Sequence, residues 1–291
     1  MESRKKQIYG LIGYPLKHSF SALMHNAAFK HLGMNAEYRL FEIKPQELQY
    51  FFHRIIPLED MHGEVFSYED LHGFNVTIPH KEMVLQFLNE ISPAAADIKA
   101  VNTVSVHKGS EFKGFNTDFS GFMRHITEMD INTDKVAIIG AGGAARAVAY
   151  ALKTKKAEEI VVYDIDNQKA QSLANDVNSW DSGCTAYAVD SIEALNLFDK
   201  TLLVNASPVG MKEDDPLLIK KSMLHKDLFV YDLIYNPADT KLLSLAQDNG
   251  LRCRNGLKML LYQGVLAFEH WSGIDAPVEI MFEALKGAMN K

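Results

Sequence analysis

The sequence predicts an α/β protein with a doubly wound second half. Short apolar runs alternate with segments of helical spacing along most of its 291 residues, and this layered pattern favours parallel strand pairing. In addition, the glycine-rich stretch 140–146 follows an apolar run and opens a segment of helical spacing. A strand, a glycine-rich turn and a helix in that order are typical of dinucleotide-binding units.

The first half alternates between strand-like and helix-like segments. The run Ile8–Ile12 is closed by Gly13 and Pro15, which indicates a strand that ends in a turn. Gly33 is a plausible C-cap for the helix before it. In order, the expected strands and helices are Ile8–Ile12, helix Ser21–Leu32, Tyr38–Ile43, helix Pro45–Ile56, Phe74–Ile78, helix Met83–Asn89 and Val101–Val106.

The second half repeats the pattern with one helix for most crossovers, which predicts a doubly wound sheet. The expected strands are Val136–Ile139, Ile160–Tyr163, Ala186–Val189, Leu202–Asn205 and Phe229–Asp232. The expected helices are Ala144–Thr154, Gln168–Val177 and Thr240–Asn249. From Leu257 to Met289 the chain is helical and amphipathic, and we expect this tail to pack on the first domain.

Composition indicates a globular protein and argues against one class of partner. Hydrophobic residues make up 47% of the chain and charged residues 23%, and the net charge is −7. This acidic balance argues against nucleic acid as the main partner. No apolar run approaches the length of a membrane helix, and the N-terminus has no secretory pattern. Cys184 and Cys253 lie too far apart for a metal-spaced pair, so we expect core thiols and a cytoplasmic protein.

The glycine-rich stretch is expected to hold the pyrophosphate of a dinucleotide. Gly140 permits a tight turn, Gly142 lets the backbone approach the phosphates, and Ala145 is small enough for helix and sheet to close up. The helix N-terminus then offers N–H groups and a partial positive charge.

The next strand supplies an acidic residue at the usual distance from the turn. Asp164 lies 24 residues after Gly140, close to where a carboxylate accepts hydrogen bonds from a ribose. A carboxylate there repels a 2′-phosphate, and Ile165 stands where an arginine would bind one. Lys169 lies one helical turn further on, but two neighbouring carboxylates oppose the binding of a phosphate by its positive charge. The sequence therefore favours NAD over NADP.

The segment 73–81 (GFNVTIPHK) combines a strand-like run with Thr77 and Lys81. A lone lysine is usually a solvated surface charge. Here the lysine follows the end of a buried strand, and a dinucleotide motif lies about sixty residues later. Together these features indicate an enzyme with separate substrate and dinucleotide sites.

These motifs, with several others, resemble the shikimate dehydrogenase family, including its quinate/shikimate dehydrogenase relatives, over essentially the whole chain. The matching segments are 13–21 (GYPLKHSFS), 73–81, 100–103 (AVNT), 116–118 (NTD), 140–144 (GAGGA), 205–211 (NASPVGM), 235–237 (YNP) and 259–264 (MLLYQG). The resemblance implies a substrate domain of residues 1–118 and 256–291, a Rossmann nucleotide domain of residues 119–255, and a cleft between them. It also implies reversible reduction of 3-dehydroshikimate to shikimate, a step of aromatic amino acid and chorismate biosynthesis.

The resemblance also implies substrate ligands. Ser19 and Ser21 match the pair that binds the carboxylate, although either could instead cap a helix. The ring-hydroxyl ligands of the family are matched by Thr77, Asn102 and Gln263, and Tyr235 matches a further ligand.

Lys81 and Asp118 match the catalytic pair of the family. A ketone that gains a hydride also needs a proton, and an ammonium can supply it and stabilise the charge. Asp118 favours the charged form of the lysine, so we expect it to orient the lysine and a substrate hydroxyl. Which of the two carries the proton stays open.

The cofactor ligands implied by the resemblance lie in the second domain. They are Gly140, Ala141, Gly142, Gly143, Ala144 and Asp164, and at the nicotinamide end Asn205, Ser207, Met211, Leu233, Gly256 and Met259. Met259 could equally be an ordinary core methionine. No metal is expected, and His18 and His80 are interpreted as structural or rim residues.

The chain departs from the family pattern at three positions, and alternative functions remain. Ser207 stands where the family usually has threonine. Lys99 and Lys258 stand where the family usually has glycine, and a left-handed backbone at either position would be strained. The first alternative is an NAD-dependent quinate/shikimate dehydrogenase that acts in the oxidative direction. The second is a non-catalytic ligand-binding homologue, against which the presence of Lys81 and Asp118 counts. The expected assembly is a monomer or a homodimer.

Overall fold

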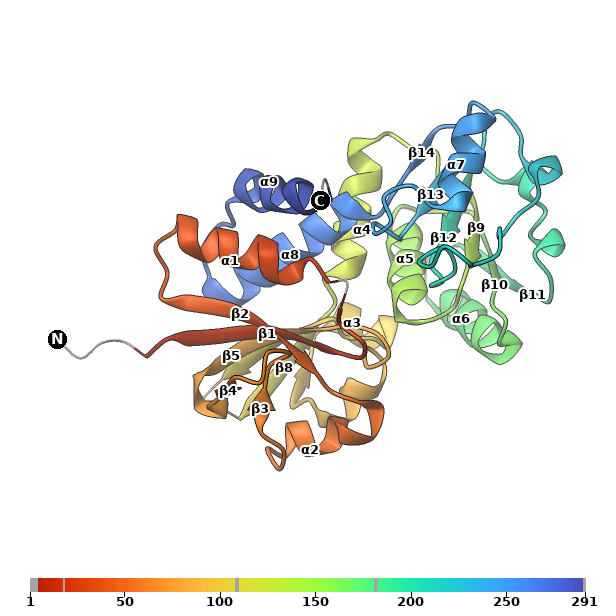
Figure 1. Cartoon of the computed structure of the whole chain (residues 1–291). Coiled ribbons are helices and arrows are strands. Elements are labelled where there is room, and N and C mark those ends of the chain that lie inside the picture. The colour runs from red at the N-terminus through yellow and green to blue at the C-terminus, as the bar shows by residue number, and fades with distance from the viewer. Residues whose placement is uncertain (1–4, 18, 108–109, 181–182, 290–291) are drawn as a thin grey trace. The chain divides into compact units, whose positions relative to one another are not determined.

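The computed structural model describes residues 5–17, 19–107, 110–180 and 183–289. The chain forms two compact units: Met1–Thr117 with Leu261–Lys291, and Asp118–Leu260. Each unit contains a six-stranded sheet of its own (Figure 1). The mixed α/β class and the parallel Rossmann-like sheet are confirmed.

The first sheet has the strand order β2-β1-β5-β7-β8-β6. Its strands are β1 (Gln7–Gly13), β2 (Ala36–Glu42), β5 (Leu71–Val76), β6 (Glu90–Ile91), β7 (Thr103–His107) and β8 (Glu111–Phe115). Both neighbours of β1 are parallel to it, whereas β7 is antiparallel to β5 and to β8. Uniform parallel pairing is therefore wrong for this sheet, because the link from β7 to β8 is too short for a parallel crossover.

Helices cover both faces of the first sheet. On one face, α1 (Ser21–His31) packs against α9 (Val278–Met289), beside α8 (Leu257–Ser272) (Figure 1). The indole of Trp271 fills the space above Gly73, where a Cβ would come within 2.5 Å of it. The C-terminal helices belong to the first unit from Leu261 onward, whereas the start of α8 belongs to the second unit.

The other face of the first sheet carries an apolar cluster that includes Phe51, Phe74 and Val104. Here the predicted helix over 45–56 is shorter: a 3-10 turn at Pro45–Glu47 leads into α2 (Leu48–Phe52). The remaining elements of this unit are a hairpin of β3 (Leu58–Glu59) and β4 (Val65–Phe66), 3-10 turns at Tyr68–Asp70 and Met83–Phe87, and α3 (Pro93–Ile98).

The second sheet is wholly parallel, with the order β11-β10-β9-β12-β13-β14. Its strands are β9 (Lys135–Ile139), β10 (Glu159–Tyr163), β11 (Thr185–Val189), β12 (Leu202–Asn205), β13 (Phe229–Asp232) and β14 (Cys253–Arg254). Its helices are α4 (Asp118–Glu128), α5 (Gly143–Thr154), α6 (Asn167–Ser179) and α7 (Lys241–Asp248), with 3-10 turns at Glu193–Leu195, Leu197–Asp199 and Lys221–Met223. The order reverses between β9 and β12, the point at which doubly wound sheets bind ligands.

The second sheet is buried on both faces. Val136 and Ile138 of β9 belong to one apolar cluster, and Ala137 and Ile139 belong to the other. Consecutive residues of a strand point to opposite faces, so a sheet covered on both sides requires continuous apolar runs. Cys184 and Cys253 are buried thiols, as expected.

Candidate functional site

In the first unit, the end of β5 leads into the turn that carries Thr77 and Lys81. The Thr77 amide donates to the carbonyl of Ile12 at 2.9 Å, and the carbonyl of Lys81 accepts from Val101 N at 2.8 Å. Between them, the fully buried His80 ring lies 2.6 Å from the Ile43 carbonyl through Nε2. Burial lowers the pKa of His80, so the imidazole is neutral and structural. The turn is thus fixed at both ends. His18 lies outside the described residues.

Asn102 and Gln263 come together although 161 residues separate them. The Asn102 side chain donates from Nδ2 to Gln263 Oε1 at 3.3 Å and to Thr117 Oγ1 at 3.0 Å. Its Oδ1 accepts from the Thr117 amide at 2.6 Å. Two of the three expected ring-hydroxyl ligands are therefore in direct contact, and Thr117 holds the amide of Asn102 on both sides.

Sequence reasoning did not identify Asn75, which lies behind this pair. Its Nδ2 donates to the Asn102 carbonyl at 3.1 Å and to Thr103 Oγ1 at 3.0 Å, and its Oδ1 accepts from the Tyr38 hydroxyl at 2.8 Å. All of these groups are buried. The one signal in the sequence was a polar residue inside the apolar run Phe74–Ile78.

Ser19 and Ser21 lie at the start of α1. Neither is its N-cap residue, which is Phe20. The Ser19 hydroxyl nevertheless accepts from the Ser21 amide at 3.3 Å, a weak local contact that leaves capacity for further bonds. The alternative that either serine caps the helix is therefore supported only by this one weak hydrogen bond.

In the second unit, the glycine-rich turn joins β9 to α5. Gly140 has φ of +102°, and a Cβ there would lie 2.9 Å from the backbone of Ala206. Gly142 is the N-cap residue of α5, and a Cβ there would meet nothing within 4 Å. The first turn of α5, with Gly143 and Ala144, is half-buried, and its leading N–H groups have no acceptor within the helix. The turn thus offers backbone donors beside open space.

Asp164 is turned toward this loop. Its Oδ2 accepts from the Ala141 amide at 2.7 Å, and its Oδ1 accepts from the Asp166 amide at 2.8 Å. Asp166 in turn caps α6 and accepts from the amides of Gln168 and Lys169. Both carboxylates therefore hold backbone in place, which the spacing in the sequence could not reveal.

The carboxyl ends of β12 and β13 share a buried polar cluster. Asn205 donates to Asp232 at 3.0 Å and accepts from the Ser207 amide at 3.0 Å. Asp232 also accepts from the Thr240 hydroxyl at 2.6 Å and from the Ile234 amide at 3.1 Å. Burial raises the pKa of Asp232 to about 6, against the lowering effect of these hydrogen bonds. Asn205 thus shapes the loop from residue 205 to 211.

The remaining expected residues of the second unit have varied environments. Asp118, the first residue of α4, and Met259 are buried, and Met259 belongs to the apolar core. Met211 is exposed. A Cβ at Gly256 would lie 2.0 Å from the carbonyl of Leu233, so these two backbones touch. Burial raises the pKa of Tyr235 to about 12.

The two lysines at glycine positions differ. Lys99 ends α3 in the left-handed region, with φ of 58° and ψ of 33°, so the expected strain is present. Lys258 lies in α8 with an ordinary helical backbone, and its ammonium is 3.2 Å from the Glu128 carboxylate.

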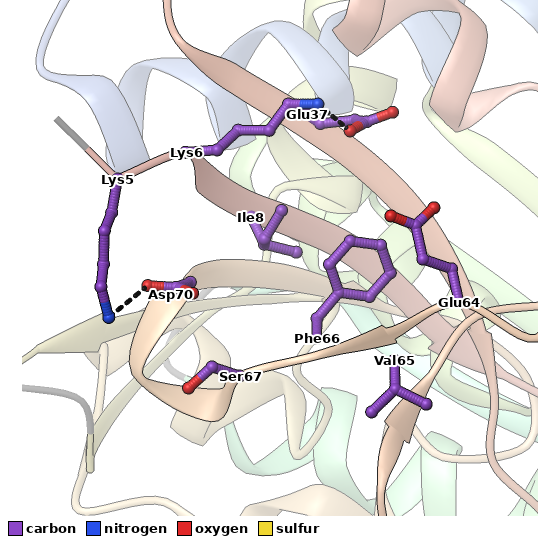
Figure 2. A pocket seen from close by; sticks show the side chains of 9 residues that line it. All are labelled: Lys5, Lys6, Ile8, Glu37, Glu64, Val65, Phe66, Ser67 and Asp70. Carbon is purple, nitrogen blue, oxygen red and sulfur yellow. Dashed lines mark hydrogen bonds and ion pairs between the residues drawn. The ribbon is translucent and has the colours of Figure 1, made fainter. Parts of the chain in front are cut away.

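A separate hollow lies at the start of β1 (Figure 2). It is lined by Lys5, Lys6, Ile8, Glu37, Glu64, Val65, Phe66, Ser67 and Asp70, which include none of the expected ligands. Lys5 pairs with Asp70 at 3.7 Å, and Lys6 pairs with Glu37. Over the ranges that the structure describes, no cluster of side chains could hold a metal ion. In those same ranges no helix is long and apolar enough to span a membrane.

Family models match most of the chain. A shikimate dehydrogenase substrate-binding domain matches residues 11–104, a shikimate/quinate 5-dehydrogenase domain residues 123–203, and a shikimate 5′-dehydrogenase C-terminal domain residues 256–286.

Individual proteins are similar over nearly their whole length. The shikimate dehydrogenase (NADP(+)) of Methanopyrus kandleri is 44% identical over 96% of this chain and 94% of the relative. That of Methanothermobacter thermautotrophicus is 38% identical over all of both chains.

Two solved structures are similar in fold. A shikimate dehydrogenase in complex with NADP+ has a TM-score of 0.86 at 35% identity and covers 100% of this chain and 98% of its own. The enzyme of Thermus thermophilus, in complex with NADP(H) and shikimate, has a TM-score of 0.82 at 32% identity, over 97% of this chain and 99% of its own.

These comparisons correct the cofactor. The sequence favoured NAD because a carboxylate at Asp164 would repel a 2′-phosphate, but the relatives are named for NADP(+) and these structures contain NADP. The physical reason lies in the contacts of Asp164. Its carboxylate accepts hydrogen bonds from the amides of Ala141 and Asp166. Its presence therefore does not indicate whether the ribose of the cofactor carries a 2′-phosphate.

Proposed function

The chain belongs to the shikimate dehydrogenase family, and on that premise we propose how its residues divide the reaction. The enzyme catalyses the reversible reduction of 3-dehydroshikimate to shikimate. Oxidation of shikimate removes a hydride from a ring carbon and a proton from the hydroxyl on it. The protein must therefore orient the ring and move one proton.

The unit of residues 1–117 and 261–291 is proposed to bind the substrate. Asn102 and Gln263 present adjacent amides to the ring hydroxyls, since their side chains already contact each other at 3.3 Å. Thr77 adds a hydroxyl at the end of β5, and Ser19 and Ser21 donate to the carboxylate. Tyr235, which belongs to the unit of residues 118–260, is proposed as a further ligand. The contact between Asn102 and Gln263 is the observation that carries this proposal.

Lys81 is proposed to exchange the proton at the reacting oxygen. Its turn is held by backbone hydrogen bonds at Thr77 and Val101, so the ammonium is presented from a rigid base. Asp118, buried at the start of α4, is proposed to hold a ring hydroxyl. In the reductive direction Lys81 gives its proton to the forming hydroxyl and stabilises the charge that develops there.

NADP is proposed as the cofactor, and the unit of residues 118–260 fits it. Gly140 allows β9 and the 205–211 loop to approach closely, and the open space at Gly142 leaves room for phosphates at the N-terminus of α5. When bound, NADP supplies or accepts the hydride. The residues proposed to contact it are Gly140, Ala141, Gly142, Gly143 and Ala144 at the phosphates, and Ser207, Met211, Leu233, Gly256 and Met259 at the other end, with Asn205 shaping their loop.

The test is the initial rate of NADPH formation with shikimate and NADP+. We expect turnover that depends on both compounds, with quinate as the matched alternative substrate and NAD+ as the matched alternative cofactor. Shikimate with NADP+ should be the best of the four combinations. Absence of shikimate-dependent NADPH formation in folded protein would contradict the proposed function.

A further inference from the structure

A series of buried hydrogen bonds crosses the first unit from β2 to α8, and one of them ends on the backbone carbonyl of Asn102. The Tyr38 hydroxyl donates to Asn75 Oδ1 at 2.8 Å. Asn75 Nδ2 donates to the Asn102 carbonyl at 3.1 Å, and Asn102 Nδ2 donates to Gln263 Oε1 at 3.3 Å. The proposed substrate ligands Asn102 and Gln263 thus lie at one end of this series of hydrogen bonds, and Tyr38 lies at the other.

Tyr38 is itself held rigidly. Asn26 of α1 clamps its backbone: Nδ2 donates to the Tyr38 carbonyl at 3.0 Å, and Oδ1 accepts from the Tyr38 amide at 2.8 Å. The ring of His25 stacks on the Tyr38 ring with centroids 4.5 Å apart and planes 7° from parallel. Tyr38 is 1% exposed, so its hydroxyl is paired with a protein group and is shielded from bulk water.

We propose that Tyr38 is a positioning residue for shikimate, acting through Asn75 on Asn102. Among the described residues, the Tyr38 hydroxyl is the group that donates a hydrogen bond to Asn75 Oδ1. Without it, a buried amide oxygen loses its donor, and the amide can rotate away from the Asn102 carbonyl. Asn102 would then lose a support on its backbone and present its side chain less accurately. The inference rests on the proposed function, because it concerns the same substrate site.

The first unit supplies a matched control. Tyr9 of β1 is the register partner of Tyr38, and it is 2% exposed. Its ring stacks on Trp271 at 5.2 Å, and among the described residues no hydrogen bond joins its hydroxyl to Asn75. Tyr38→Phe and Tyr9→Phe therefore remove the same atom from neighbouring strands, but only the first cuts the chain that leads to Asn102.

The experiment measures the KM for shikimate and for NADP+, with kcat and the thermal midpoint, in wild type and both variants. Tyr38→Phe should raise the KM for shikimate about three- to tenfold, the equivalent of one net hydrogen bond. The KM for NADP+ should stay within about twofold, and Tyr9→Phe should leave both values within about twofold. A merely structural role would lower the active fraction, which changes the apparent kcat but not KM.

Asn75→Ser and the double variant complete the test. Asn75→Ser should raise the KM for shikimate at least as much, and adding Tyr38→Phe should raise it no further, because both changes act on one path. An unchanged KM for shikimate in Tyr38→Phe, or an equal rise in Tyr9→Phe, would overturn the inference and leave the proposed function standing. If Tyr38→Phe does not fold, an unchanged KM in Asn75→Ser overturns it. A folded wild type without shikimate-dependent activity would instead contradict the proposed function, and this inference with it.

Discussion

The two units place their buried polar groups in different ways. In the first unit, side chains bond to side chains within the sheet, as Tyr38, Asn75, Thr103 and Asn102 do. In the second unit, the strand interiors are apolar, and polar side chains at the strand ends mostly hold backbone, as Asp164 holds the Ala141 amide. The difference suggests that a polyhydroxylated ring is recognised by oriented side chains, and phosphates by backbone N–H groups.

The largest effect should come from the one cation proposed to do chemistry. Lys81→Ala removes the proton donor, and we expect turnover to fall at least about 100-fold. Binding of NADP+ should persist, because the glycine-rich turn is untouched. Lys30→Ala, an exposed lysine in α1, is the control and should behave as wild type. Turnover within a few-fold of wild type in Lys81→Ala would show that another group carries the proton.

Substitutions at two glycines of the second unit distinguish an effect on backbone geometry from an effect on cofactor binding. Gly140→Ala places a methyl 2.9 Å from the Ala206 backbone at φ of +102°, so it should cost about 2–3 kcal/mol of stability and weaken NADP+ binding more than tenfold. Gly142→Ala meets no protein atom within 4 Å and should weaken NADP+ binding while the thermal midpoint stays unchanged. Calorimetry and cofactor titration would show this. Equal loss of stability in both variants would refute the distinction.

Two buried histidines allow the units to be compared by pH. Burial lowers the pKa of His25 to about 3, and both its ring nitrogens lack partners among the described residues. Burial, with a smaller effect of Lys258, lowers the pKa of His125 to about 4, and its Nδ1 is 2.7 Å from the Tyr231 hydroxyl. The unfolded chain binds protons first as the pH falls below about 6.5, so each histidine lowers stability by about 1.4 kcal/mol per pH unit toward its folded pKa.

His25→Phe should therefore flatten the fall in stability between about pH 6.5 and 3 without a loss at pH 7. His125→Phe should also flatten it, over the narrower window down to about pH 4. However, it should cost about 1–3 kcal/mol at pH 7, because the Tyr231 hydroxyl is left buried without this partner. Denaturant unfolding at a series of pH values measures both. A loss at pH 7 in His25→Phe as large as in His125→Phe would be evidence against this distinction.

The smallest effect concerns the lysines at glycine positions. Lys99→Gly relieves a left-handed residue but loosens the unfolded chain, so we expect stability to rise by at most about 0.5 kcal/mol. Lys258→Gly places glycine in α8 and should lower stability by about 0.5–1 kcal/mol. In thermal unfolding, the two variants should therefore change stability in opposite directions. A clear loss of stability in Lys99→Gly would mean that the side chain of Lys99 stabilises the fold more than its backbone strain destabilises it.

The sequence predicted the second unit better than the first for a physical reason. The predicted run Leu202–Asn205 coincides with β12, and Phe229–Asp232 coincides with β13, because a sheet buried on both faces leaves continuous apolar runs. In the first unit, β8 (Glu111–Phe115, sequence EFKGF) was missed, because it is five residues long and has no continuous apolar run.

The candidate residues show the same limit. The glycine-rich turn was found because its pattern is local in the sequence. The hydroxyl of Tyr38 meets Asn75 across 37 residues, and Asp164 meets Ala141 across 23. No spacing rule gives either contact, and the second one explains why the carboxylate was misread as a sign of NAD.

The central claim is that shikimate is recognised chiefly by side chains of the first unit, while backbone N–H groups of the glycine-rich turn in the second unit bind the phosphates of NADP. The most direct test measures the KM for shikimate and for NADP+ in Tyr38→Phe and Gly142→Ala side by side. The account predicts that Tyr38→Phe raises only the KM for shikimate and that Gly142→Ala raises only the KM for NADP+. Both constants rising together in either variant would contradict it.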